Sequence, residues 1–491
     1  MAQARRLALC AAVVLLAGCG GSSGPKPPPG GPSLRLALPL VPATLDPAKA
    51  ADLPSLNVSH ELYAGLTRFA GTGVKPDLAE SWDVGDDGLV WTFHLREGIR
   101  WSNDTPITAA DFSRSWLRAL APKTAAPYAG PALGIVRGAR RFHATGRGGL
   151  GVEALDDHTL RVTLEHPVPW FDELAAFPIA APAPPKATAY SGPFRLASRS
   201  SDRLVLERNF NYWDAGDVNP SRLVLSASAK NADAVLPSGL AGPGLPWIDT
   251  IRPAPRGAVE LPTLATGLLW LVTRGTPLAD LGARQFVAWV VTHLDLDTPP
   301  ATLVPREMPG AGTVNSHAPV RLESAPRRLR LTLVWAASDT AGAKIAAELR
   351  RNGKQLSSFG IELDYRPVRN IGELLGLAGP PPRPGVDLVL LGWSSKIFDA
   401  YNLLDVFPCG SAFNVAGWCD PSYDALMRQA VRTLDDEARW RIERRLVEKL
   451  HDAVPAIPIY TASDHFSLAP GVHGFSWSPI GFYELMGMTR S

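Results

Sequence analysis

The chain has 491 residues, of which 46% are hydrophobic and 20% are charged. This composition can bury two or three substantial cores, so it predicts a multi-domain globular protein and excludes a disordered chain. Lysine plus arginine (49) nearly balances aspartate plus glutamate (47), so no net charge recruits nucleic acid or an anionic membrane surface. We therefore expect no nucleic-acid partner.

The N-terminus has the pattern of an export signal. Arg5 and Arg6 precede an apolar run, Leu7–Ala17, that is too short to span a bilayer as a mature helix. The run ends in Leu16-Ala17-Gly18-Cys19, and a Gly/Ser tract follows. The pattern resembles a bacterial lipobox, in which the thiol of Cys19 carries a diacylglyceryl group; the alternative is an ordinary cleaved signal with a chance cysteine. We expect lipidation at Cys19 and a Pro- and Gly-rich tether through Pro32.

Strand patterns dominate the first half of the mature chain. Thr108 and Asp111 together predict the capped start of a helix, whose apolar residues then recur every four positions. Paired acids before Gly88 indicate a hairpin turn. Alternating hydrophobicity predicts strands at 34–38, 90–95, 158–165 and 203–208.

Between about 230 and 328 the pattern is poorer, with one clear apolar segment at Phe286–Leu294. From Arg328 the chain becomes regular again, with a helix over 340–351 that Gly353 is expected to cap. Strands are expected at 329–335, 361–366 and 386–391, with a second, short helix at 371–377. This β-α-β-α-β order predicts a parallel sheet. Helices then follow Asp420-Pro421 and precede Pro455, the second opening at the acids Asp435-Asp436.

The mature chain keeps two cysteines, Cys409 and Cys419. A pair ten positions apart in an exported protein is most simply a disulfide that pins a local loop. A metal or redox role is the weaker alternative, because no His or acidic cluster lies beside them at ligand spacing and they are not a Cys-x-x-Cys pair.

The sequence contains none of the common catalytic motifs. The only Gly-Lys, at Gly353, continues into Gln355 and therefore lacks the Ser or Thr of a phosphate-binding loop. There is no His-Glu-x-x-His for zinc and no Gly-x-Ser-x-Gly elbow for a serine hydrolase. We therefore expect no enzyme activity, no cofactor and no metal.

Several ordered motifs resemble the family-5 extracellular solute-binding proteins of ABC importers, most nearly the oligopeptide-binding proteins. The most specific is the succession Lys75-Pro-Asp-Leu-Ala-Glu-Ser-Trp82, Asp87-Gly-Leu-Val-Trp-Thr-Phe-His-Leu-Arg96 and Trp101-Ser-Asn-Asp-Thr-Pro-Ile-Thr-Ala-Ala-Asp-Phe112. Further blocks continue in order to Ile457-Pro-Ile-Tyr460, so the resemblance spans nearly the whole mature chain.

The resemblance implies an α/β fold, namely a periplasmic-binding-protein-like two-lobed clamp (type II) with an extra third domain. It also implies a monomer that closes on its ligand and meets permease subunits at the outer face of the bacterial cytoplasmic membrane. The expected parts are a signal peptide (1–18), a lipid-anchored tether (19–33), lobe I (34–53, 175–235 and 465–491), an extra domain (54–174) and lobe II (236–464).

In peptide binders of this family an aspartate in a Trp…Asp-Tyr-Asn-like segment meets the ligand ammonium. The similar segment here runs from Trp393 to Asn402 and follows the last strand of the predicted parallel sheet, where a binding crevice is expected. The resemblance implies Asp399 as the ammonium partner and Trp393, Tyr401 and Tyr128 as walls of the cleft.

Two alternatives to a peptide receptor stay open. The same fold could bind another solute, such as a metal chelate, a sugar or an opine-like compound, because Thr273–Arg284 departs from the family pattern. From a different class, the chain could be a surface lipoprotein that has lost transport and acts as a sensor or scaffold.

Overall fold

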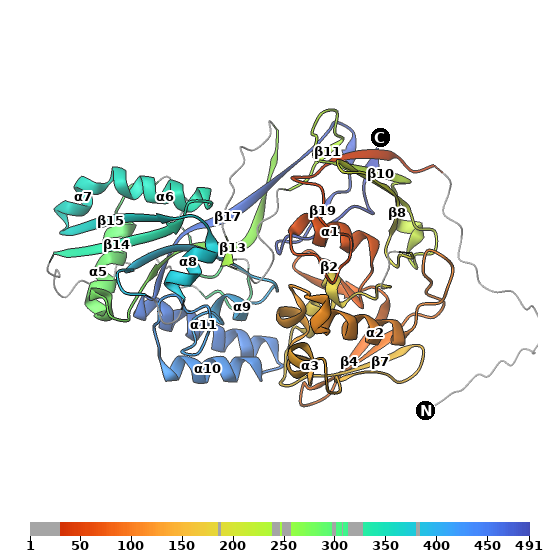
Figure 1. The fold of residues 1–491 in the computed structure, drawn as a ribbon, viewed down its shortest axis with the longest axis horizontal. Coiled ribbons are helices and arrows are strands. Elements are labelled where there is room, and N and C mark those ends of the chain that lie inside the picture. The colour runs from red at the N-terminus through yellow and green to blue at the C-terminus, as the bar shows by residue number, and fades with distance from the viewer. Residues whose placement is uncertain are drawn as a thin grey trace, which may run out of the picture.

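The computed structural model describes residues 30–184, 188–237, 246–247, 257–296, 301–306, 308–312, 328–379 and 383–491. The export signal, Cys19 and most of the tether therefore lie outside the described residues. Within the described ranges, no helix is both long enough and apolar enough to cross a membrane. Figure 1 shows two bodies side by side, with the long strands β13 (Val259–Leu271) and β17 (Ala456–Leu468) running from one to the other.

The C-terminal body contains the predicted β-α-β-α-β unit. Its strands β14 (Leu329–Ala336), β15 (Ile361–Val368) and β16 (Leu388–Ser394) are parallel, as expected. Apolar side chains of the sheet pack against the helices beside it to form a separate hydrophobic core. The other elements of this body are β12 (Pro246–Trp247), α5 (Leu281–Thr292), α6 (Thr340–Arg351), α7 (Gly353–Ser358), α8 (Ile371–Ala378), α9 (Tyr401–Leu404), α10 (Pro421–Val431) and α11 (Asp436–Ala453).

One sequence prediction is wrong in this body, and its sheet also contains strands that the sequence did not predict. Gly353 does not cap α6, because Asn352 ends that helix and Gly353 opens α7 directly. The sheet is also not purely parallel, because β13 pairs antiparallel with both β16 and β17. Pro262 and Gly267 interrupt the alternation of β13, and the register shifts near both residues, which hid this strand from pattern reasoning.

The large sheet continues into the N-terminal body. Its strand order is β15-β14-β16-β13-β17-β11-β1-β10-β9-β8, with β12 attached to β16. We use the name lobe I for the part of this body that contains β1 (Ser33–Ala37), β8 (Phe194–Arg199), β9 (Arg203–Arg208), β10 (Arg222–Ser226) and β11 (Ala234–Val235). Four short C-terminal strands belong to the same part: β18 (Val472–His473), β19 (Ser476–Trp477), β20 (Tyr483–Glu484) and β21 (Thr489–Arg490).

Helix α1 (Leu53–Leu62) packs against the C-terminal segment, although more than 400 residues separate them. The Asn57 side chain accepts from the amide of Tyr483 at 3.0 Å and donates to the carbonyl of Gly481 at 3.0 Å. Glu61 accepts from the amide of Leu485 at 2.8 Å. The two ends of the described chain therefore complete one core.

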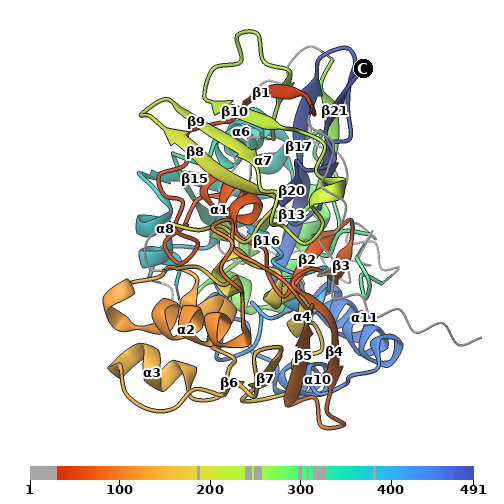
Figure 2. The ribbon, with the colours of Figure 1, turned by 90° about the vertical axis from the view of Figure 1, so that its right-hand side faces the viewer.

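The extra domain contains a separate four-stranded sheet in the order β4-β5-β7-β6, seen at the lower end of the molecule in Figure 2 with α2 and α3 beside it. Thr108 and Asp111 form the predicted capping box at the start of α2, and Gly88 lies in the predicted hairpin turn. The elements are β2 (Thr67–Ala70), β3 (Gly73–Pro76), β4 (Ala79–Val84), β5 (Val90–Leu95), α2 (Ala109–Leu120), α3 (Ala139–Thr145), β6 (Val152–Ala154), β7 (Thr159–Thr163) and α4 (Phe171–Ala175).

The two bodies share β13 and β17, and the pairing of these strands is interrupted between them. The register moves from Pro262 opposite Ser463 to Thr266 opposite Thr461. At the interruption, the Leu264 amide donates to the carbonyl of Pro479 in lobe I at 3.1 Å, and its carbonyl accepts from Ser395 in lobe II at 2.8 Å. Leu264 is therefore hydrogen-bonded to both lobes.

Candidate functional site

Trp393 lies near the end of β16, opposite Thr266 of β13. Its side chain is only 4% exposed and packs against Phe413, with ring centroids 5.0 Å apart. The indole Nε1 is nevertheless buried without a hydrogen-bond partner in the part of the chain that the structure describes. Because buried donors are normally satisfied, this nitrogen is an exception that a bound acceptor would account for.

Tyr128 presents a similar case in the extra domain. Its side chain is 3% exposed, and its hydroxyl has no hydrogen-bond partner among the described residues. Burial, with a smaller contribution from the charge of Asp52, raises the pKa of this hydroxyl, so it stays a neutral donor. Two of the predicted cleft residues thus each offer a polar atom that the surrounding protein does not use.

Asp399 lies in a different environment, because its carboxylate is already paired inside the protein. Its exposed fraction is 2%, and its Oδ2 accepts from Nε and Nη2 of Arg439 at 3.1 and 2.9 Å. Its Oδ1 accepts from the amide of Tyr401 at 2.9 Å. The structure therefore brings Asp399 and Tyr401 together, while no described contact joins either residue to Trp393 or Tyr128.

Further carboxyls gather around the same guanidinium. Arg439 lies in the first turn of α11, where its Nη2 is 2.8 Å from Asp436, and its Nε is 3.6 Å from Glu443. Burial, followed by the charge of Asp399, raises the pKa of Glu443, so this side chain is neutral near pH 7. A neutral Glu443 can donate a hydrogen bond to Asp399. Three acids can therefore lie beside one arginine without all three carrying a negative charge.

This group reaches the extra domain through α4 and the residue before it. The rings of Trp170 and Tyr401 lie 4.6 Å apart between centroids, and the Arg439 guanidinium lies 5.6 Å from the Trp170 ring. Glu173 accepts from the amide of Phe398 at 2.7 Å. The segment after β16 is therefore held to α4 by a hydrogen bond and a ring contact.

Sequence reasoning missed Arg439, Glu173 and Trp170. A signal for the first was present, since Arg439 and Glu443 are four residues apart and fall on the apolar stripe of α11 with Ile442 and Leu446. Charged residues on a buried stripe need a partner from elsewhere in the fold. No comparable pattern marks Glu173, whose partner is a backbone amide 225 positions away.

Cys409 and Cys419 form a disulfide that closes the loop between α9 and α10. The amide of Cys409 also donates to Asp424 of α10 at 3.1 Å. Among the residues that the structure describes, no group of three or more His, Cys, Asp or Glu side chains is arranged to hold a metal ion.

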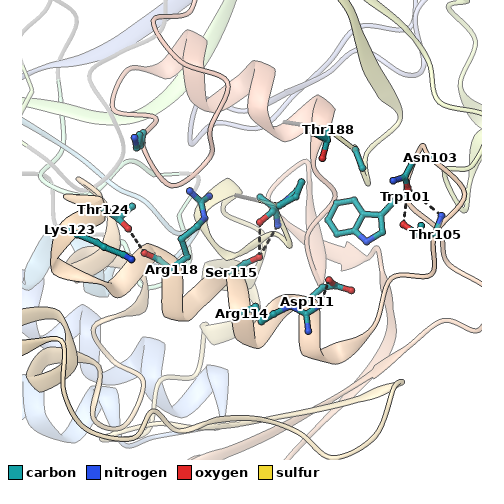
Figure 3. A pocket seen from close by; sticks show the side chains of 14 residues that line it. Trp101, Asn103, Thr105, Asp111, Arg114, Ser115, Arg118, Lys123, Thr124 and Thr188 are labelled. Carbon is teal, nitrogen blue, oxygen red and sulfur yellow. Dashed lines mark hydrogen bonds and ion pairs between the residues drawn. The ribbon is translucent and has the colours of Figure 1, made fainter. Parts of the chain in front are cut away.

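A polar cavity of about 600 Å³ runs along α2, with Arg118 and Ser115 on its wall (Figure 3). The guanidinium of Arg118 donates to both oxygens of Asp46, at 2.9 and 2.7 Å. Ser115 donates to the carbonyl of Ala183 at 3.2 Å and accepts from its amide at 2.8 Å. None of the four predicted ligand residues lines this cavity, and these contacts hold α2 to the chain on either side of it.

Comparison with known proteins agrees with this architecture. The family model for bacterial extracellular solute-binding proteins, "family 5 Middle", matches residues 73–291. The periplasmic oligopeptide-binding protein OppA of Salmonella typhimurium is 26% identical over 481 residues, covering 88% of each chain. The chain is a family-5 solute-binding protein. Members of this family are substrate-binding proteins of ABC importers, and the sequence of this chain is similar to those of oligopeptide-binding members.

Other relatives of this solute-binding protein differ in what their names say they bind. The probable deoxycholate-binding periplasmic protein YgiS of Escherichia coli is 28% identical over 479 residues, covering 88% of this chain and 89% of YgiS. Among solved structures, the unliganded open form of the murein tripeptide binding protein MppA has a TM-score of 0.74 and 22% identity, covering 93% of this chain and 97% of MppA. The fold is the expected type II clamp.

Proposed function

We propose that this protein captures oligopeptides between its lobes and delivers them to the membrane permease of an ABC importer. Family membership supports the class of activity, and OppA and MppA, which are named for peptides, support the ligand. The observation that carries the proposal is the pair of unsatisfied buried polar atoms, Trp393 Nε1 in lobe II and Tyr128 Oη in the extra domain. An extended peptide presents carbonyls and amides at regular intervals, and such groups would satisfy both atoms.

The first experiment identifies the ligand directly. Mass spectrometry of small molecules released from the purified protein is expected to yield peptides, and a peptide pool is expected to raise the melting temperature. A pool that leaves the melting temperature unchanged, while another solute class raises it, would refute the peptide ligand.

The Trp393→Phe variant tests the unsatisfied nitrogen. Nε1 has no partner among the described residues, so its removal breaks no hydrogen bond within them, and any loss in the free energy of unfolding is expected to come from the smaller ring. If a peptide carbonyl accepts from this nitrogen, affinity for the peptide pool falls by about fivefold to tenfold, the worth of one hydrogen bond. Trp440→Phe, which removes another unpartnered indole nitrogen, is the matched control and should bind normally.

We keep Asp399 as the proposed partner of the ligand ammonium, together with Tyr401 as a cleft wall. An ammonium at this position would share the carboxylate with Arg439, which already donates to it twice. Acetylating the peptide N-terminus is then expected to weaken binding more than tenfold, because a charged hydrogen bond is lost. Equal affinity for free and acetylated peptides would show that Asp399 does not bind the ligand ammonium.

A second candidate ligand is an anionic steroid, favoured by the similarity to the probable deoxycholate-binding protein YgiS. Titration with deoxycholate below its micelle concentration, in parallel with the peptide pool, separates the two. The ligand that raises the melting temperature at lower concentration is the one the cleft prefers.

We also propose that a lipid on Cys19 holds the protein at the outer face of the bacterial cytoplasmic membrane, with residues 19–33 as tether and the folded part as a monomer. Metabolic labelling with a fatty acid is expected to mark the wild type but not a Cys19→Ser variant. Unlabelled wild-type protein would show that the cysteine follows an ordinary signal by chance.

A further inference from the structure

The extra domain touches lobe II at a place distinct from the two shared strands. Besides the Glu173 hydrogen bond to Phe398 and the contact of Trp170 with Tyr401, the side chain of Leu434 covers the hairpin turn at Gly88. A Cβ added at Gly88 would lie 2.6 Å from Leu434. We call these contacts the second bridge between the two bodies.

The second bridge concentrates acidic groups from both bodies around one cation. Lobe II contributes the guanidinium of Arg439 and three acids, namely Asp399, Asp436 and Glu443. Helix α4 contributes two more acids, Asp172 and Glu173. If all five carboxyls were ionised, one positive charge would face five negative charges at close range. Such an arrangement is stable only if some of the acids hold a proton.

Glu173 is the acid whose hydrogen bond crosses between the bodies. The charged groups that face it are Asp172 on its own helix, Asp399 on the segment before α9 and Arg439 on α11. Its bond to Phe398 needs only one carboxyl oxygen, so a neutral carboxyl can still accept the amide hydrogen, although the bond to a carboxylate is stronger and by itself lowers the pKa. The neutral form avoids repulsion from the two aspartates.

We propose that Glu173 is a positioning residue that holds the extra domain against lobe II in its protonated form, so that loss of its proton opens the second bridge. The extra domain would then no longer be held to lobe II by these contacts, while β13 and β17 would still join the described bodies. The proposal concerns the ligand-free clamp and is independent of the ligand class.

The direction of the pH dependence follows from the environment of the carboxyl. Burial, with the charges of Asp172 and Asp399, raises the pKa of Glu173 from 4.5 to about 8. When the bridge opens, the carboxyl is solvated and its pKa returns toward the ordinary value. The bridge is therefore fully stabilised below about pH 4.5 and loses this stabilisation as the pH rises through about 8.

Amide exchange of Phe398 reports the bridge directly, because its N–H is the donor. In the ligand-free full chain, the exchange rate divided by the intrinsic rate is expected to rise up to tenfold per pH unit between about pH 5.5 and about pH 8. In Glu173→Gln, whose amide oxygen accepts the same hydrogen but cannot ionise, the corrected rate should stay low and flat. In Glu173→Ala it should be high at every pH.

A matched control is Glu165→Gln in the same domain. Glu165 also accepts a backbone amide at 2.7 Å, that of Gly138, but it lies outside the second bridge, so this variant should keep the wild-type slope at Phe398. Exchange of Leu329–Ala336 in β14 must be the same in all variants, which establishes that lobe II is folded. A Glu173→Gln variant that retains the wild-type pH slope, or a folded Glu173→Ala variant with unchanged protection, overturns the proposal.

Discussion

Replacing Arg439 by methionine tests how strongly the buried acids of lobe II depend on a single guanidinium. Methionine keeps much of the apolar stem but removes the charge and both hydrogen bonds to Asp399. Asp399 is 2% exposed and Arg439 is 4% exposed, so water cannot easily replace the lost partner. Breaking a buried pair in this way costs about 3–5 kcal/mol, which lowers the folding equilibrium constant more than a hundredfold.

The loss should also depend on pH. Arg439 also holds down the pKa of the buried Asp172, so without the guanidinium that pKa rises further above its value in the unfolded chain and the folded state binds the extra proton. Stability is then present at low pH and declines as the pH rises through the raised pKa. Arg439→Met is therefore expected to be less destabilising at about pH 5 than at about pH 8.

Urea unfolding at the two pH values measures both effects. The control is Arg330→Met, because Arg330 makes a similar paired contact with Asp364, at 2.8 and 3.1 Å, on the surface. Water and salt screen that pair, so its removal should cause no measurable change. Adding Asp399→Asn to Arg439→Met should recover part of the loss. Equal effects of the two arginine variants would refute the reasoning.

Three further predictions concern other parts of the fold. Replacing Cys409 and Cys419 by serine removes a cross-link over a separation of ten residues, which should cost about 2–3 kcal/mol by the loop-closure model and lower the melting temperature of the oxidised protein only. Gly267→Ala places a methyl group against the ring of Tyr460, so it should destabilise by about 1–3 kcal/mol, and Tyr460→Leu in the same chain should recover most of that loss. Burial and the nearby guanidinium of Arg68 lower the pKa of His60 from 6.5 to about 3. The neutral His60 therefore contributes stability that is fully present above pH 6.5 and is lost as the pH falls toward 3. In His60→Gln, the melting temperature should fall less steeply over this pH range.

Pattern reasoning was sufficient wherever local sequence and tertiary packing agree. The predicted helix over 340–351 is α6, with the same ends, and the predicted strand from residue 361 is β15. The acids at Asp435-Asp436 open α11 as expected, with the Asp435 side chain accepting from the amide of Ala438 at 2.8 Å. In each case a capping residue or an apolar stripe within the element itself is enough to predict the element.

The long strand β13 shows why the remainder was not predictable. Its 13 residues include Pro262 and Gly267, which are unfavourable inside a strand, and its pairing partners lie more than 100 residues away. The candidate site has the same limitation. Asp399 could be identified from the residues around it, but its pairing with Arg439 is a property of the folded chain.

The packing of α1 on the C-terminal segment has a consequence for the order of folding. Asn57 and Glu61 gain their backbone partners only when residues 481–485 arrive, and β11 and β13 of the central sheet both pair with β17. Neither body can therefore complete its sheet or its core before nearly the whole chain is available. Loop closure over such distances is slow, so both bodies are expected to acquire their native contacts late and together, after the C-terminal segment has been synthesised.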